Sequence, residues 1–193
     1  MERENQRNGR NKNTIINHTY MDSGEYRRKF DKISDNVKLN RLLYYLARVM
    51  LEHRSGTLYE DMYWVELKDI RVVARETESD IEEGIRYSGR TEKVIKTRRQ
   101  LLTIHSHPHS FPPSIADFNS NFRNQYVVGI IICHNGKIYM YSAEEEISEK
   151  YYNLVVEEYI KQGYNECEAQ IKTLEELKNK FAIKFKEVTA HDV

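Results

Sequence analysis

The sequence predicts an α/β fold in which a β-sheet is flanked by helices and followed by a C-terminal helical extension. Two observations support this prediction. Apolar residues recur every three or four positions between residues 39 and 50, as they do on one face of a helix. Short runs of β-branched and aromatic residues then alternate with polar segments, and the last third of the chain returns to helical periodicity. Helices and strands in this order pack as layers around a sheet.

Length and charge narrow the classes of function. The 193 residues suffice for one domain with appendages. The chain carries 30 basic and 30 acidic residues, so its overall charge gives no reason to expect nucleic-acid or membrane binding. Basic side chains do gather within residues 1–12, at Arg3, Arg7, Arg10 and Lys12. We expect a disordered tail there, with a polyanion-binding arm as the alternative.

Cysteine usage and hydropathy indicate a cytoplasmic protein. The two cysteines, Cys133 and Cys167, suggest neither a disulfide framework nor a cysteine-based zinc site. No apolar stretch approaches the ~20 residues of a membrane span. The polar N-terminus also lacks the apolar core of a signal peptide. We therefore expect no membrane partner.

The chain is expected to divide into three segments. Residues 1–33 are polar and are predicted to be largely irregular, although a weak patch between Tyr20 and Phe30 could dock on the domain. Residues 34–145 are expected to form the main domain. Residues 146–193 are expected to form C-terminal helices.

The main domain is predicted to begin with a helix that Ser34 or Asp35 caps and Gly56 ends. Its apolar stripe consists of Leu39, Leu42, Leu43, Leu46, Val49 and Met50. Two strands are then predicted at residues 60–67 and 70–74, followed by an acidic loop at residues 76–90. A short basic helix is predicted at residues 91–100, and a strand at residues 101–104 that ends at His105.

Prolines and glycines mark the boundaries of the next elements. Pro112 and Pro113 cannot continue a strand, so Ser114 is expected to cap a following turn of helix. Residues 126–133 form the most apolar run and predict a central strand. The pair Asn135-Gly136 then predicts a tight turn into a return strand at residues 137–142.

The C-terminal segment is predicted to be helical throughout. Ser148 caps a helix that ends at Gly163. A charged helix follows, and its narrow apolar stripe consists of Cys167, Ile171, Leu174, Leu177 and Phe181. We expect this stripe to pack on its own domain, and the alternative is association with a partner helix or a second copy of the chain.

Residues 105–117 concentrate the residue types of a metal site. They contain three of the seven histidines and all three prolines. His105 and His107 are two positions apart, so their side chains point to the same face of a strand. Asp117, on the next helix, can return to the same point. Zinc binds imidazole nitrogen and carboxylate oxygen, and three protein ligands leave the fourth position for water. We expect one Zn²⁺ per chain, with His109 outside the ligand set.

A site of this kind can hydrolyse an amide bond. Water on zinc loses a proton near neutral pH and becomes a competent nucleophile. A carboxylate beside it would act as general base and then protonate the leaving amine. The hydroxyl of Ser114 could hydrogen-bond the developing oxyanion.

The run His105-Ser106-His107-Pro108, followed by Ser114-Ile115-Ala116-Asp117, resembles the signature of the JAMM (MPN+, JAB domain) zinc metallopeptidases. The resemblance covers roughly residues 35–143 and includes the order of the predicted elements. It implies a mixed sheet of the cytidine-deaminase-like type and the metalloprotease or isopeptidase activity of a bacterial or phage member. The sequence departs from the family in one respect, because five residues separate the proline from the serine where six are common.

The resemblance also implies a catalytic glutamate at the start of the strand that follows the first helix. Glu60 has this position, and Glu52 and Glu66 are the alternatives. The region that helps to grip the modifier in deubiquitinating members corresponds to residues 76–100, whose composition indicates no specificity here. The implied substrate is a protein or peptide, with ubiquitin-like and sulfur-carrier proteins as candidates.

Two other classes of function are considered. A non-catalytic MPN-like module would bind a protein partner, but such modules have usually lost the metal ligands that this sequence retains. A nucleic-acid function is less favoured, because the charge is balanced and no Pro-Cys-x-x-Cys follows the histidines as a zinc deaminase requires.

Overall fold

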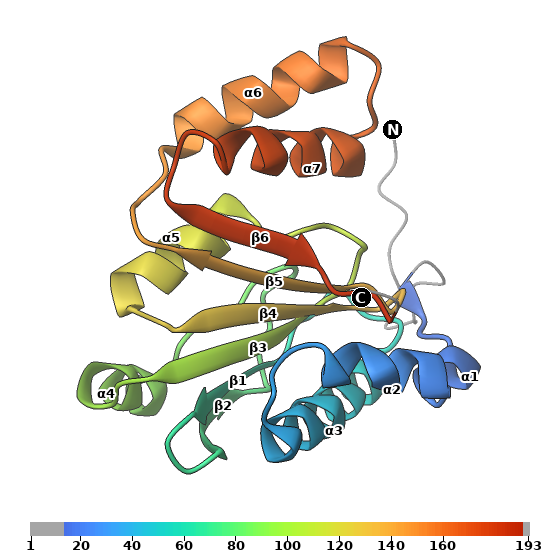
Figure 1. Ribbon diagram of the computed structural model, residues 1–193, viewed down its shortest axis with the longest axis vertical. Coiled ribbons are helices and arrows are strands. Elements are labelled where there is room, and N and C mark those ends of the chain that lie inside the picture. The colour runs from blue at the N-terminus through green and yellow to red at the C-terminus, as the bar shows by residue number, and fades with distance from the viewer. Residues whose placement is uncertain (1–13, 191–193) are drawn as a thin grey trace.

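The computed structural model describes residues 14–190 and has an α/β architecture (Figure 1). The described residues form one six-stranded sheet with strand order β2-β1-β3-β4-β5-β6. Strands β3 and β4 are parallel, and the other neighbouring pairs are antiparallel. The predicted α/β class, with a mixed sheet flanked by helices, is therefore confirmed. The strands are β1 (Met62–Glu66), β2 (Arg71–Glu76), β3 (Leu101–His107), β4 (Val128–Cys133), β5 (Ile138–Ala143) and β6 (Ile183–Glu187).

Seven helices within residues 14–190 flank this sheet. They are α1 (His18–Met21), α2 (Gly24–Asp31), α3 (Val37–Arg54), α4 (Gly89–Thr97), α5 (Ile115–Asn124), α6 (Glu149–Lys161) and α7 (Glu166–Leu177). Helix α3 packs on one face of β3 and β4, and α5 packs on the opposite face against β4 and β5 (Figure 1). None of the helices in this part of the chain combines the length and the apolar content needed to cross a bilayer.

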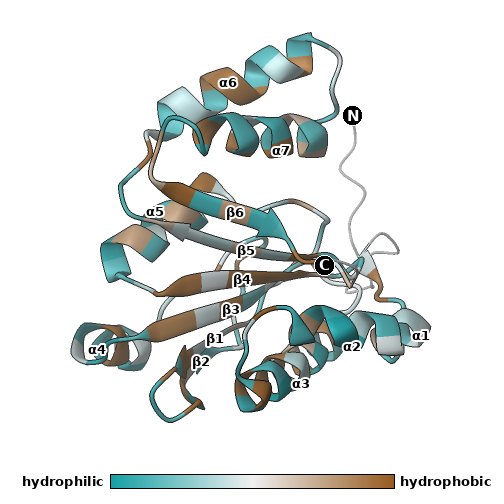
Figure 2. Cartoon of the chain, in the orientation of Figure 1, coloured by the Kyte–Doolittle hydropathy of each residue, from teal (hydrophilic) through white to brown (hydrophobic). Residues whose placement is uncertain are grey.

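Side-chain alternation on the central strands divides the core between the two faces. On β4, Ile130 and Ile132 join the cluster around α2 and α3, whereas Ile131 and Cys133 join the cluster around α5, α6 and α7. Figure 2 shows the apolar character of β3 and β4 beside helices that mix apolar and hydrophilic residues. The same period of two gives the strands at the candidate site two chemically different faces.

The N-terminal part of the described chain differs from the prediction. Residues 14–33 belong to a segment predicted to be largely irregular, yet they contain α1 and α2. Ser23 caps α2, and its Tyr26 and Phe30 are almost fully buried against Tyr44 of α3. The prediction was wrong here because tertiary packing, rather than local periodicity, stabilises such short helices. Arg3, Arg7, Arg10 and Lys12 lie outside the described residues.

The prediction that the C-terminal segment is helical throughout was wrong. Helices α6 and α7 are present, but residues 183–187 form β6 and pair antiparallel with β5. The alternation of Ile183 and Phe185 with exposed lysines is a strand pattern that could have been recognised in the sequence. Leu174 and Leu177 of α7 are buried in the cluster that β5 and β6 help to form, so the apolar stripe packs on its own domain.

The predicted cap of α3 was wrong, because Asn36 caps this helix in place of Ser34 or Asp35. Other expected boundaries are confirmed, and Gly56 follows the end of α3 with a positive φ of 77°. Ser114 caps α5 and Ser148 caps α6, as predicted. Gly136 has a φ of 87° and closes the turn between β4 and β5, which is the hairpin that Asn135-Gly136 indicates.

Gly129 of β4 offers a direct test of the packing beside the site. A Cβ atom at this position would lie 2.1 Å from Cζ of Tyr141, whose ring packs 6.4 Å from that of His105. We expect Gly129→Ala to destabilise the protein by about 1–3 kcal/mol, which is typical of overpacking in a core. Thermal unfolding followed by circular dichroism measures the effect. Gly89→Ala is the control, because no atom of the described residues lies within 4 Å of a Cβ there. Equal melting temperatures for the two variants would contradict the packing described.

Candidate metal centre

Two histidines of β3 meet at one point on the face of the sheet that α5 covers. His105 and His107 are 2% and 9% exposed, and their Nε2 atoms lie 3.1 Å apart. Nδ1 of His107 is 3.3 Å from the carbonyl oxygen of Phe111, to which it can donate, so Nε2 is left free to act as a ligand. Within residues 14–190, Nδ1 of His105 has no hydrogen-bond partner, so in this part of the chain only contacts at Nε2 can select its tautomer.

Asp117 reaches the same point from the first turn of α5. Its Oδ1 lies 3.3 Å from Nε2 of His105, and its Oδ2 lies 3.7 Å from Nε2 of His107. The backbone N–H and the hydroxyl of Ser114 both donate to Oδ2 of Asp117, each at 2.7 Å. This reciprocal capping holds the carboxylate in place. The five-residue loop between Pro108 and Ser114 thus brings Asp117 to the histidines.

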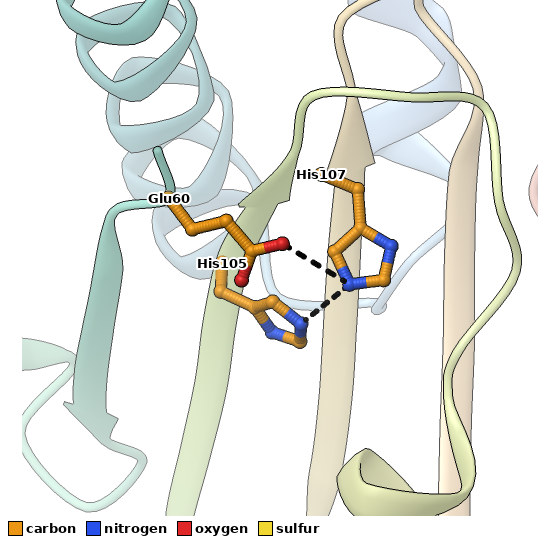
Figure 3. Close-up of side chains that lie close together, drawn as sticks. All are labelled: Glu60, His105 and His107. Atoms are coloured by element: carbon orange, nitrogen blue, oxygen red, sulfur yellow. Dashed lines mark hydrogen bonds and ion pairs between the residues drawn. The ribbon is translucent and has the colours of Figure 1, made fainter. Parts of the chain in front are cut away.

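Glu60 approaches the histidines from the residues just before β1. It is 7% exposed, and its Oε1 lies 3.9 Å from Nε2 of His107. Glu60, His105 and His107 each offer an atom within 4.8 Å of the others, so this group could hold a metal ion. Figure 3 shows the three side chains pointing toward one another from β3 and from the chain before β1.

The other two glutamates considered as bases are engaged elsewhere. Near the end of α3, Oε1 of Glu52 lies 3.0 Å from Nδ1 of His18. Glu66, at the far end of β1, pairs with Arg98 at 2.6 Å and Arg71 at 3.0 Å. Neither pair includes a residue of the histidine cluster, so the geometry favours Glu60.

The spacing of the donor atoms fits a tetrahedral zinc ion. With bonds of about 2.0–2.1 Å, two ligand atoms of such an ion are separated by about 3.3–3.4 Å. The Nε2 atoms of His105 and His107 lie 3.1 Å apart, Oδ1 of Asp117 lies 3.3 Å from His105, and Oδ2 of Asp117 lies 3.7 Å from His107. Two imidazoles and a carboxylate are also a donor set that zinc accepts. These three residues therefore fit zinc, with Glu60 beside them.

Burial and mutual charge shift the pKa values of all four side chains. Burial raises the pKa of Glu60 to about 8, and the charges of Asp117 and Glu83 add to this although His105 opposes it. Burial lowers the pKa of His107 to about 4, and His105 contributes to the same shift. Burial also opposes charge on His105 and Asp117, but their attraction outweighs it, so the pKa of His105 rises and that of Asp117 falls. Burial thus favours the neutral form of Glu60, and a cation bound beside it would favour the carboxylate instead.

A cavity of about 470 Å³ opens onto this cluster. Its walls include the start of β1, β3 and the loop after it, residues between 83 and 87, α5, Tyr126, Tyr141 of β5 and the N-terminal half of α7. Glu166 and Gln170 of α7 line it, and sequence reasoning missed them because polar residues on a charged helix give no signal. His109 also lines the cavity, but its Nε2 contacts Glu83 at 3.1 Å and not the histidine cluster.

The predicted role of Ser114 is constrained by its contacts. Its side chain lines the cavity, but its hydroxyl already donates to Asp117. Ser114 therefore fixes a ligand of the candidate centre. A hydrogen bond from Ser114 to an oxyanion would require the hydroxyl to leave Asp117.

Comparisons of the chain with known protein families, with curated proteins and with solved structures found no match. The function must therefore be inferred from the residues of this chain.

Proposed function

We propose that this chain is a JAMM-type zinc metallopeptidase that hydrolyses an amide bond at the C-terminus of a ubiquitin-like or sulfur-carrier protein. One observation carries the proposal. The Nε2 atoms of His105 and His107 lie 3.1 Å apart and the two carboxylate oxygens of Asp117 lie 3.3 and 3.7 Å from them, which is close to the ligand spacing of tetrahedral zinc, and a buried Glu60 lies beside them. The JAMM-like order of these residues in the sequence supports the same function.

Each side chain of the site has a separate role in the proposed hydrolysis. His105, His107 and Asp117 would hold the ion, which when bound supplies Lewis acidity and lowers the pKa of water toward neutrality. Glu60 accepts a proton from the attacking water and returns it to the leaving amine. Ser114 holds the carboxylate of Asp117. Burial of Glu60, His105 and His107 strengthens these charge interactions.

The charge of the cavity supports a peptide or isopeptide bond within a protein as the substrate. Among the described residues that line the cavity there is no lysine or arginine. A free C-terminal carboxylate or a phosphate would find no lysine or arginine side chain to bind there. We therefore favour cleavage at an internal amide or isopeptide bond over removal of single C-terminal residues and over chemistry on nucleic acids.

Metal analysis combined with an activity assay tests the proposal. We expect about one zinc per chain in purified protein, and hydrolysis of at least one fusion in a panel of ubiquitin-like and sulfur-carrier proteins with C-terminal extensions or isopeptide-linked lysine. Dialysis against a chelator should abolish hydrolysis, and added zinc should restore it. Folded protein that binds no zinc would refute the proposal. Zinc binding without hydrolysis across the panel would instead indicate a non-catalytic module.

A further inference from the structure

A buried polar network lies directly behind Glu60, on the opposite face of the sheet. Strand alternation turns Glu60 toward the histidines and the next side chain, Asp61, toward α3. Asp61 is fully buried, with Nε of Arg54 at 2.5 Å from its Oδ1 and Nδ1 of His53 at 2.8 Å from its Oδ2. Arg54 also donates to the carbonyl of Thr77 at 2.6 Å. The end of α3 is thereby joined to the residue that follows Glu60.

A second set of bonds joins Asp61 to the strand that carries the histidines. Ser106, between His105 and His107, is fully buried on the same face as Asp61. Its backbone N–H donates to the carbonyl of Asp61 at 3.0 Å. Its hydroxyl accepts the backbone N–H of Asp61, also at 3.0 Å. The backbone next to Glu60 is therefore clamped to the residue between the two histidines.

We propose that Asp61 and Ser106 are positioning residues, which hold the carboxylate of Glu60 at its distance from the histidines. The proposal rests on the function proposed for Glu60 as general base. A buried ion pair contributes little net stability, because well-packed apolar residues of similar volume often stabilise a protein as much. This network joins α3, the start of β1 and β3, and it therefore constrains the backbone position from which the Glu60 side chain extends.

Asp61→Asn tests the proposal, because it keeps the shape of the side chain and removes its charge. The zinc ligands come from β3 and α5, so zinc content should match that of the wild type. We expect kcat to fall by about 10- to 100-fold with KM within about twofold, since a misplacement near 1 Å can cost about 100-fold in rate. Glu66→Gln is the matched control, because it breaks an ion-pair cluster at the far end of the same strand.

A double-mutant cycle separates positioning from general stability. If Asp61 acts through Glu60, Asp61→Asn should cause little further loss of residual activity when Glu60→Gln is already present. A purely structural role would multiply the two losses, and that result would overturn the proposal. Ser106→Ala, which removes one bond of the clamp, gives the same test should Asp61→Asn not fold.

The outcomes also separate this proposal from the proposed function. Wild-type protein without zinc or hydrolysis would overturn both. Activity that is lost with Glu60→Gln but equals the wild type with both Asp61→Asn and Ser106→Ala would overturn the positioning role alone.

Discussion

Replacement of His107 by alanine is expected to reduce zinc binding to a small fraction of one ion per chain and to abolish hydrolysis. The substitution removes one of three side chains whose donor atoms lie 3.1–3.7 Å apart. Loss even of an outer-shell partner typically costs about 10- to 100-fold in metal affinity, so loss of a ligand should cost at least about 100-fold. Competition with a chromophoric chelator measures the affinity, and mass spectrometry of the metals measures the content.

His109→Ala is the matched control for this experiment. His109 belongs to the same loop region and lines the same cavity, but it pairs with Glu83. Zinc should also raise the melting temperature of the wild type and of His109→Ala, and should leave that of His107→Ala unchanged, because ligands stabilise only the state that binds them. Unchanged zinc affinity in His107→Ala would show that the proposed ligand set is wrong.

Replacement of Glu60 by glutamine is expected to leave zinc in place and to reduce kcat by about 100- to 10,000-fold, the usual contribution of a general base. Glutamine has nearly the same shape but cannot accept the proton. We expect zinc to remain because Oε1 of Glu60 lies 3.9 Å from Nε2 of His107. This distance is longer than the 3.1 and 3.3 Å contacts that His105 makes with His107 and Asp117. Steady-state kinetics on the best substrate of the panel, with metal content measured on the same samples, would give both quantities.

Glu83→Gln is the control for Glu60, because both carboxylates line the cavity while Glu83 is more than half exposed and pairs with His109. We expect Glu83→Gln to keep kcat within a few-fold of the wild type. Loss of zinc in Glu60→Gln would instead identify Glu60 as a ligand. Its atoms lie close enough to those of both histidines for that role. Wild-type kcat in Glu60→Gln would remove it from the mechanism altogether.

Local signals in the sequence predicted much of the fold around the site. Ser114 caps α5 because its hydroxyl can accept the backbone N–H of Asp117 three residues later. Gly136 closes the hairpin because its positive φ suits a residue without a side chain. Each of these features depends on interactions within a few residues. Helices α1 and α2 could not be predicted in this way, because Tyr26 and Phe30 become ordered by burial against α3.

The sequence by itself determined the residue types of the centre and the common face of His105 and His107, because strand periodicity is a local property. It favoured Glu60 only through the family resemblance and could not exclude Glu52 and Glu66, which are also acids near the end of a helix or strand. The tertiary structure distinguishes them. Antiparallel pairing of β1 with β3 sets Met62 opposite His105 and so brings the preceding Glu60 to His107. Pairing between such distant segments depends on the burial of the core as a whole, which no short stretch of sequence encodes.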